Sequence, residues 1–134
     1  MNKQYGKYGE AAINVARKCI RSGFDPIAQW KSEMERLFPN SIEEQKKGCP
    51  RCAFLGLCKE GLVKGISPRD YTYSEKNKNY ALKAVELLEI GRRYSSPIEL
   101  WRAVTNSSGR GDYQMDVVLA LWENNLIVRR ESHL

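Results

Sequence analysis

Six segments of the chain carry apolar residues at the spacing of an α-helix, and each segment lies between signals that start and stop a helix. In the first segment Ala12, Ala16 and Ile20 recur every four residues, and Gly23 follows as a stop. Apolar side chains at this spacing form a stripe that has to be covered, so the pattern predicts an all-α protein. The predicted helices are residues 8–21, 26–38, 50–60, 75–91, 97–105 and 113–124.

Polar side chains mark where four of these helices begin, because a side-chain oxygen can accept from the free backbone N–H groups of a first turn. The predicted capping residues are Asp25, Ser74, Ser96 and Asp112. Gly61 and Asn125 are predicted to take the left-handed conformation that ends a helix, and short extended pieces follow each of them. The polar stretch 41–47 predicts a loop or a short helical turn.

The order and spacing of these signals recur in the two halves of the chain. Each half has a capped Pro-Ile-x-x-Trp helix start, followed later by a helix with the same type of ending. The matching segments are 12–16 with 84–88, 25–31 with 96–102, and 54–63 with 118–127. The similarity predicts six helices arranged as two tandem three-helix repeats around one shared core, since neither repeat can cover its own stripes. The alternative is that similar helices use similar caps.

We therefore expect a single helical domain over residues 1–134, with its halves in a pseudo-twofold arrangement. A chain of this length is sufficient for one core. The expected parts are a first repeat at about 5–66, a linker at 67–73, a second repeat at about 74–128 and a frayed tail at 129–134.

The net charge of +6 is concentrated in the first half of the chain. Residues 1–66 carry twelve Lys and Arg against seven Asp and Glu, whereas residues 67–134 carry ten against nine. A basic half favours an anionic partner such as nucleic acid. The alternative is that the charge serves solubility alone.

Hydropathy predicts no membrane segment, because no stretch reaches the roughly 18 apolar residues of a spanning helix. Residues 1–10 also lack the apolar core of a signal peptide. We therefore predict a cytoplasmic protein whose four cysteines are free thiols.

Three cysteines, Cys49, Cys52 and Cys58, have the spacing C-x2-C-x5-C, which suits part of a zinc or iron–sulfur site. The spacing resembles the last three ligands of the cluster loop in some base-excision DNA glycosylases, but Ile42 stands where the first ligand would fall. Cys49 and Cys52 also form a Cys-x-x-Cys motif at a predicted helix start, where redox chemistry is an alternative. In the repeat alignment Cys58 matches Trp122, so the preferred interpretation is packed thiols with no metal or other cofactor.

A cluster of cations and glycine precedes the third predicted helix. Free N–H groups, a flexible glycine and nearby positive charge together predict a site for an anion or a nucleic-acid phosphate. In the second half Arg110 precedes the last helix in the same way. The predicted anion-binding residues are Lys46, Lys47, Gly48, Arg51 and Arg110. The alternative is an ordinary solvated helix start.

Catalysis has little support in the sequence, since the single histidine, His133, lies in the predicted tail and no paired carboxylates stand out. Residues 119–130 resemble the recognition helix and first wing strand of winged-helix proteins, but the acidic side chains of this helix oppose a phosphate surface.

Three segments, 47–66, 71–88 and 114–127, resemble a family of short bacterial proteins with no assigned function. The resemblance covers nearly the whole chain and implies a bacterial cytoplasmic protein, without implying an activity or a cofactor.

We therefore predict a non-enzymatic binding module that uses a basic face for nucleic acid or another anionic or protein partner, and a homodimer is compatible with this. The alternative is a metal- or thiol-dependent protein that uses Cys49, Cys52 and Cys58.

Overall fold

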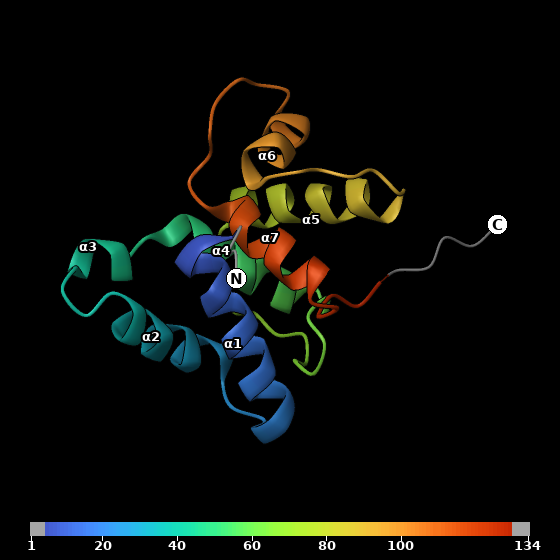
Figure 1. Ribbon diagram of the computed structural model, residues 1–134. Helices are drawn as coiled ribbons and strands as arrows, with labels where there is room; N and C mark the ends of the chain where they lie inside the picture. Colours follow the sequence, from blue (N-terminus) through green and yellow to red (C-terminus); the bar gives the residue numbers. More distant parts are fainter. Residues whose placement is uncertain (1–4, 130–134) are drawn as a thin grey trace.

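The computed structural model describes residues 5–129, and this part of the chain is helical throughout its regular structure (Figure 1). Six helices correspond to the six predicted ones, and a single turn, α3, falls in the stretch that was expected to be a loop or a helical turn. The helices are α1 (Gly6–Ser22), α2 (Pro26–Leu37), α3 (Ile42–Gln45), α4 (Gly48–Lys59), α5 (Glu75–Glu89), α6 (Pro97–Thr105) and α7 (Gln114–Glu123).

Helices α4 and α7 lie at the centre and pack against each other (Figure 1). Both are buried on every side, since residues 53–58 of α4 and 117–121 of α7 are buried without interruption. A helix that is apolar all round has to be surrounded by other elements. Helix α1 packs along α7 and helix α5 packs along α4, while α2 packs mainly on α1, and α6 packs on both α5 and α7.

The segments that follow the two central helices pair with each other. Gly61 and Asn125 both have positive φ, at 74° and 60°, which confirms the predicted left-handed stops. Beyond them Val63 and Ile127 form an isolated antiparallel bridge. Lys64 N donates to Leu126 O at 2.9 Å, and Val128 N donates to Leu62 O at 2.7 Å. The ends of α4 and α7 are therefore tied together through the backbone.

Three of the four predicted caps are confirmed. The side chain of Asp25 accepts from Ile27 N and Ala28 N, that of Ser74 accepts from Asn77 N, and that of Ser96 accepts from Glu99 N.

The predicted cap at Asp112 is wrong. Helix α7 begins after Tyr113, which has a φ of 73° and makes no side-chain capping bond. The carboxylate of Asp112 lies instead 3.8 Å from Lys47 Nζ, so it is engaged with the segment before α4. Helix α4 also begins at Gly48, two residues earlier than expected. Pro50 is compatible with this start, because it lies in the first turn, where the backbone N–H groups have no partner within the helix. The predicted frayed tail falls mostly on residues 130–134, outside the described part of the chain.

Glycines allow the helices to come close at two contacts. A Cβ at position 56 would lie 2.7 Å from the Cβ of Lys78 and 2.8 Å from its Cα, so α4 and α5 meet backbone to backbone there. A Cβ at Gly9 would lie 2.9 Å from the carbonyl oxygen of Asp116, across the contact of α1 with α7.

The side chain of Asp116 lies in this α1–α7 contact. A Cβ on Gly6 would be 3.7 Å from its Oδ2, and burial raises the pKa of the carboxyl from 3.8 to about 7. Bonding with the backbone acts in the opposite direction but is the smaller effect.

Replacement of Gly56 tests the close approach of α4 and α5. Gly56→Ala is expected to lower the free energy of unfolding by roughly 1–3 kcal/mol, because the new methyl group forces the helices apart. Thermal unfolding followed by circular dichroism measures the loss. Gly48→Ala is the control, since a Cβ there would meet nothing closer than 3.6 Å. Equal stability of the two variants would contradict the close packing.

Burial of Asp116 predicts a dependence of stability on pH. The folded protein holds a proton on this carboxyl up to about pH 7, whereas the unfolded chain releases it near the ordinary value of 3.8. The resulting stability is complete below the unfolded pKa and is lost as the pH rises through the folded pKa. Asp116→Asn is therefore expected to raise the melting temperature above pH 7 and to leave it unchanged near pH 3.8. Parallel melting profiles of the two proteins across this range would rule out the effect.

Candidate anion-binding sites

A groove of about 660 Å³ lies between α2, the beginning of α4 and the segment 71–73. Lys46 and Arg51, two of the predicted anion-binding residues, both line it. They stand beside Lys31 of α2, while Trp30 and Leu55 contribute apolar surface. The structure therefore brings part of the predicted site together around a hollow. Apolar and basic side chains thus share the lining, and they include Ile27, Trp30, Lys31, Met34, Lys46 and Arg51.

The other predicted anion-binding residues have different surroundings. Lys47 is directed at Asp112, at 3.8 Å, and at the ring of Tyr113, whose centroid is 5.9 Å from Nζ. Gly48 is the first residue of α4, and Arg110 is exposed in the loop before α7. None of these three lines the groove, so the predicted set does not form one site.

The cysteines differ in burial and contacts. Cys58 is completely buried and Cys19 nearly so, and burial raises the pKa of each thiol, well above its usual range for Cys58. Cys49 is half-buried, and its pKa is raised first by burial and then by the carboxylate of Asp112. Cys52, also half-buried, accepts from the Thr72 hydroxyl at 3.4 Å. Within residues 5–129 no three His, Cys, Asp or Glu side chains are arranged to hold a metal ion. The raised thiol pKa values of Cys19, Cys49 and Cys58 do not favour nucleophilic or redox chemistry at these three positions.

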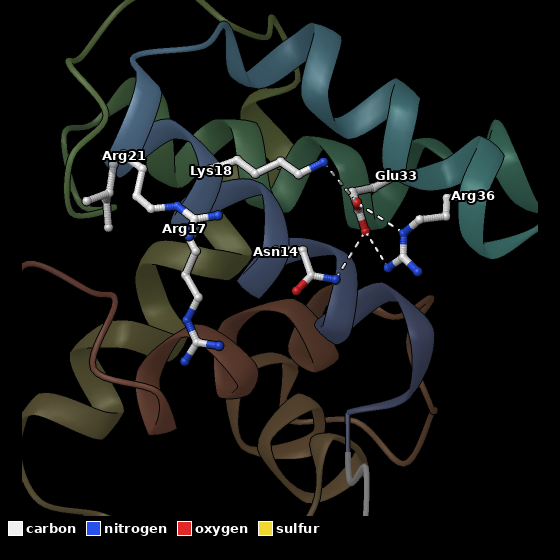
Figure 2. Close-up of a pocket in the computed structure, with 7 residues that line it drawn as sticks. Asn14, Arg17, Lys18, Arg21, Glu33 and Arg36 are labelled. Atoms are coloured by element: carbon white, nitrogen blue, oxygen red, sulfur yellow. Dashed lines mark hydrogen bonds and ion pairs between the residues drawn. The ribbon is translucent and has the colours of Figure 1, made fainter.

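A second hollow, of about 450 Å³, lies on the opposite side of α2, between it and α1 (Figure 2). Its polar lining residues are Asn14, Arg17, Lys18, Arg21, Glu33 and Arg36. Glu33 is buried and accepts from Arg36 at 2.9 Å and from Asn14 at 3.2 Å, while Lys18 lies 3.8 Å away. Burial acts to raise the pKa of Glu33, but these hydrogen bonds outweigh it and lower the pKa. Its negative charge is therefore already satisfied by the protein.

The arginines of α1 in this hollow have fewer partners. Arg17 and Arg21 are exposed, and neither forms an ion pair with a carboxylate of the described residues. Arg17 extends along α1 towards α7 and donates to Asn124 Oδ1 at 3.5 Å (Figure 2). None of these α1 residues was among the predicted anion-binding residues. The spacing of Arg17, Lys18 and Arg21 could have indicated them, because it places all three on the outer face of the first helix.

A third hollow, of about 610 Å³, continues the positive surface beyond Asn124. Arg92, Arg93 and Arg129 line it, and the guanidinium of Arg129 lies 4.2 Å from the ring centroid of Trp122. Lys64 Nζ donates to Asn125 Oδ1 at 3.1 Å at its edge. The cations that border the second and third hollows, without Arg36, which is bound to Glu33, are here called the basic band. They are Arg17, Lys18, Arg21, Lys64, Arg92, Arg93 and Arg129.

The fold and these hollows define a small helical protein with positively charged concave surfaces on both sides of α2. The chain belongs to the family of unknown function DUF6979, whose family model matches residues 5–128. This agrees with the resemblance to a family without an assigned function. No curated protein and no solved structure matches the chain.

Among residues 5–129, no helix is both long enough and apolar enough to cross a membrane.

Thiol labelling tests the electrostatic surroundings of the cysteines. With iodoacetamide near neutral pH, Cys49 of the native protein is expected to react more slowly than free cysteine, because a raised pKa leaves less thiolate. Cys58 is expected to react only after unfolding, since its side chain is inaccessible. Peptide mass spectrometry after timed labelling measures both rates, with the urea-unfolded protein as the control. A native Cys49 that reacts faster than free cysteine would favour the thiol-dependent alternative.

Proposed function

We propose that this protein is a non-enzymatic binding module that holds the phosphate backbone of nucleic acid on its basic band. The observation that carries the proposal is the position of Arg17. Its side chain lines the hollow between α1 and α2 and also reaches Asn124, next to the hollow that contains Arg92, Arg93 and Arg129. Asn124 and its neighbour Asn125, which lines the third hollow, thereby link Arg17 of the first half to the cations of the second half.

The types of side chain in the band support a phosphate partner. Five of its seven members are arginines, whose planar guanidinium groups can bind phosphate oxygens through two parallel hydrogen bonds. The acidic group in the second hollow, Glu33, is already bound by Arg36 and Asn14. It therefore leaves Arg17 and Arg21 available. The net charge of +6 adds a long-range attraction for a polyanion.

The band is suited to binding without sequence recognition. Its members are distributed over α1 and the segments that follow α4, α5 and α7, so no single helix projects into a groove of a duplex. Contacts to phosphates alone give affinity that depends strongly on salt. Such a role is consistent with the predicted bacterial cytoplasmic location, which we include in the proposal. The proposal is also compatible with a homodimer.

We also infer that the fold arose as two three-helix repeats in one domain, with residues 67–73 as the linker. The pairing of elements supports this, because α1 covers α7 of the other half and α5 covers α4. The same hydrogen bond closes both central helices, from Leu62 N to Leu57 O and from Leu126 N to Leu121 O, each 2.9 Å long. The bridge between Val63 and Ile127 joins matching positions of the two proposed repeats, as a pseudo-twofold axis requires.

Removal of charge from the band tests the proposed function. The double variant Arg17→Ala/Arg21→Ala is expected to bind labelled single-stranded and duplex oligonucleotides at least about tenfold more weakly at low salt. The slope of log K against log salt is expected to fall by roughly 1–2, because up to two phosphate contacts are lost. Fluorescence anisotropy over a salt series measures both quantities.

The matched control is Lys76→Ala/Lys83→Ala, which removes the same charge from exposed positions on α5 outside the band. It is expected to retain most of the affinity. Equal losses in the two double variants would mean that net charge alone drives binding. No binding of wild-type protein at low salt would overturn the proposed function.

A further inference from the structure

The groove that holds Lys46 and Arg51 is separate from the basic band. Helix α2 divides the two surfaces, since Glu33 and Arg36 face α1, whereas Trp30, Lys31 and Met34 line the groove. We propose that this groove is a binding site for a small organic anion that has a flat apolar body, such as an aryl carboxylate or an aryl sulfonate. This goes beyond the proposed nucleic-acid function and does not depend on it.

The size and lining of the groove fit a small molecule. Its volume of about 660 Å³ falls within the range of roughly 300–1,000 Å³ that is usual for ligand pockets. Trp30, Met34 and Leu55 are nearly or fully buried and form apolar surface, and Ile27 is 44% exposed at the edge. A flat apolar body placed here would contact these side chains and would cover the exposed surface of Ile27 from water, which is favourable by about 25 cal/mol per Å².

The charges around the groove favour an anion. Lys31, Lys46 and Arg51 come from two sides of it, against one acidic residue, Glu35. None of the three cations forms an ion pair with a carboxylate among the described residues. Arg51 is half-buried at the first turn of α4, where the helix dipole adds to its attraction for a negative group. The anionic group of the ligand is therefore expected between Lys46 and Arg51.

Two aromatic features support a planar ligand with an acceptor. Tyr73 lies at the rim with 88% of its surface exposed, so its ring is free to stack on a ligand. The indole Nε1 of Trp30 is buried and has no hydrogen-bond partner, and within residues 5–129 it is the only buried side-chain nitrogen or oxygen in this condition. Buried donors are nearly always satisfied, and Trp30 lines the groove, so a ligand acceptor that reaches this N–H would satisfy it.

Binding of 8-anilinonaphthalene-1-sulfonate to the full chain tests the site, with N-phenyl-1-naphthylamine as the uncharged molecule of the same ring system. The sulfonate is expected to bind wild-type protein at least about tenfold more tightly than the amine, a difference of about 1.4 kcal/mol. Lys46→Ala/Arg51→Ala is expected to remove this preference, and Lys76→Ala/Lys83→Ala is expected to keep it. Fluorescence titration measures the affinities, and a cooperative thermal transition of each variant shows that it is folded.

The location is tested by the indole N–H resonances of the three tryptophans, of which Trp30 is assigned with Trp30→Phe. The sulfonate is expected to shift the Trp30 resonance. Absence of binding to wild-type protein, equal affinity for the two probes, or shifts at Trp101 or Trp122 alone would each overturn the proposal. The Arg17→Ala/Arg21→Ala variant is expected to bind the sulfonate normally, so failure of the nucleic-acid proposal remains distinguishable from failure of this one.

Discussion

The need to cover two helices that are apolar on every side governs this structure. Helices α4 and α7 have no polar face to offer to water, so they lie against each other, and α1 and α5 cover them. Close contact requires small residues at the crossings, which explains Gly56 beside Lys78 and Gly9 beside Asp116. The positions of α2 and α6, which pack on these four helices, follow from this central pair.

Local signals were sufficient to predict the helices, because caps, left-handed stops and apolar spacing act within a few residues. Gly61 and Asn125 illustrate this, since both take positive φ as predicted. Asp112 shows the limit. Its side chain is engaged by Lys47, which is distant in the sequence, and α7 starts without it. A capping rule contains no information about a partner that only the folded chain supplies.

The same limit applies to the candidate sites. Lys46 and Arg51 were predicted together from one short segment, and they do share a groove, whereas Lys47 and Arg110 were grouped with them only by sequence proximity or analogy. The basic band was not predicted, because its members come from four separate parts of the chain. Only packing places Arg17 next to Asn124. Two faces of α2 also belong to different environments, since Glu33 and Arg36 line the hollow beside α1, whereas other α2 residues line the groove.

Helices α1 and α7, which come from different halves of the chain, pack on each other, and this affects the order of folding during synthesis. Helix α4 leaves the ribosome well before α5, the helix that covers it, and α1 can pack on α7 only after α7 has been synthesised. Contacts so distant in sequence form late and at a cost in chain entropy. The first 66 residues therefore emerge with their most apolar helix uncovered, and the apolar surface of α1 stays exposed until α7 has been translated.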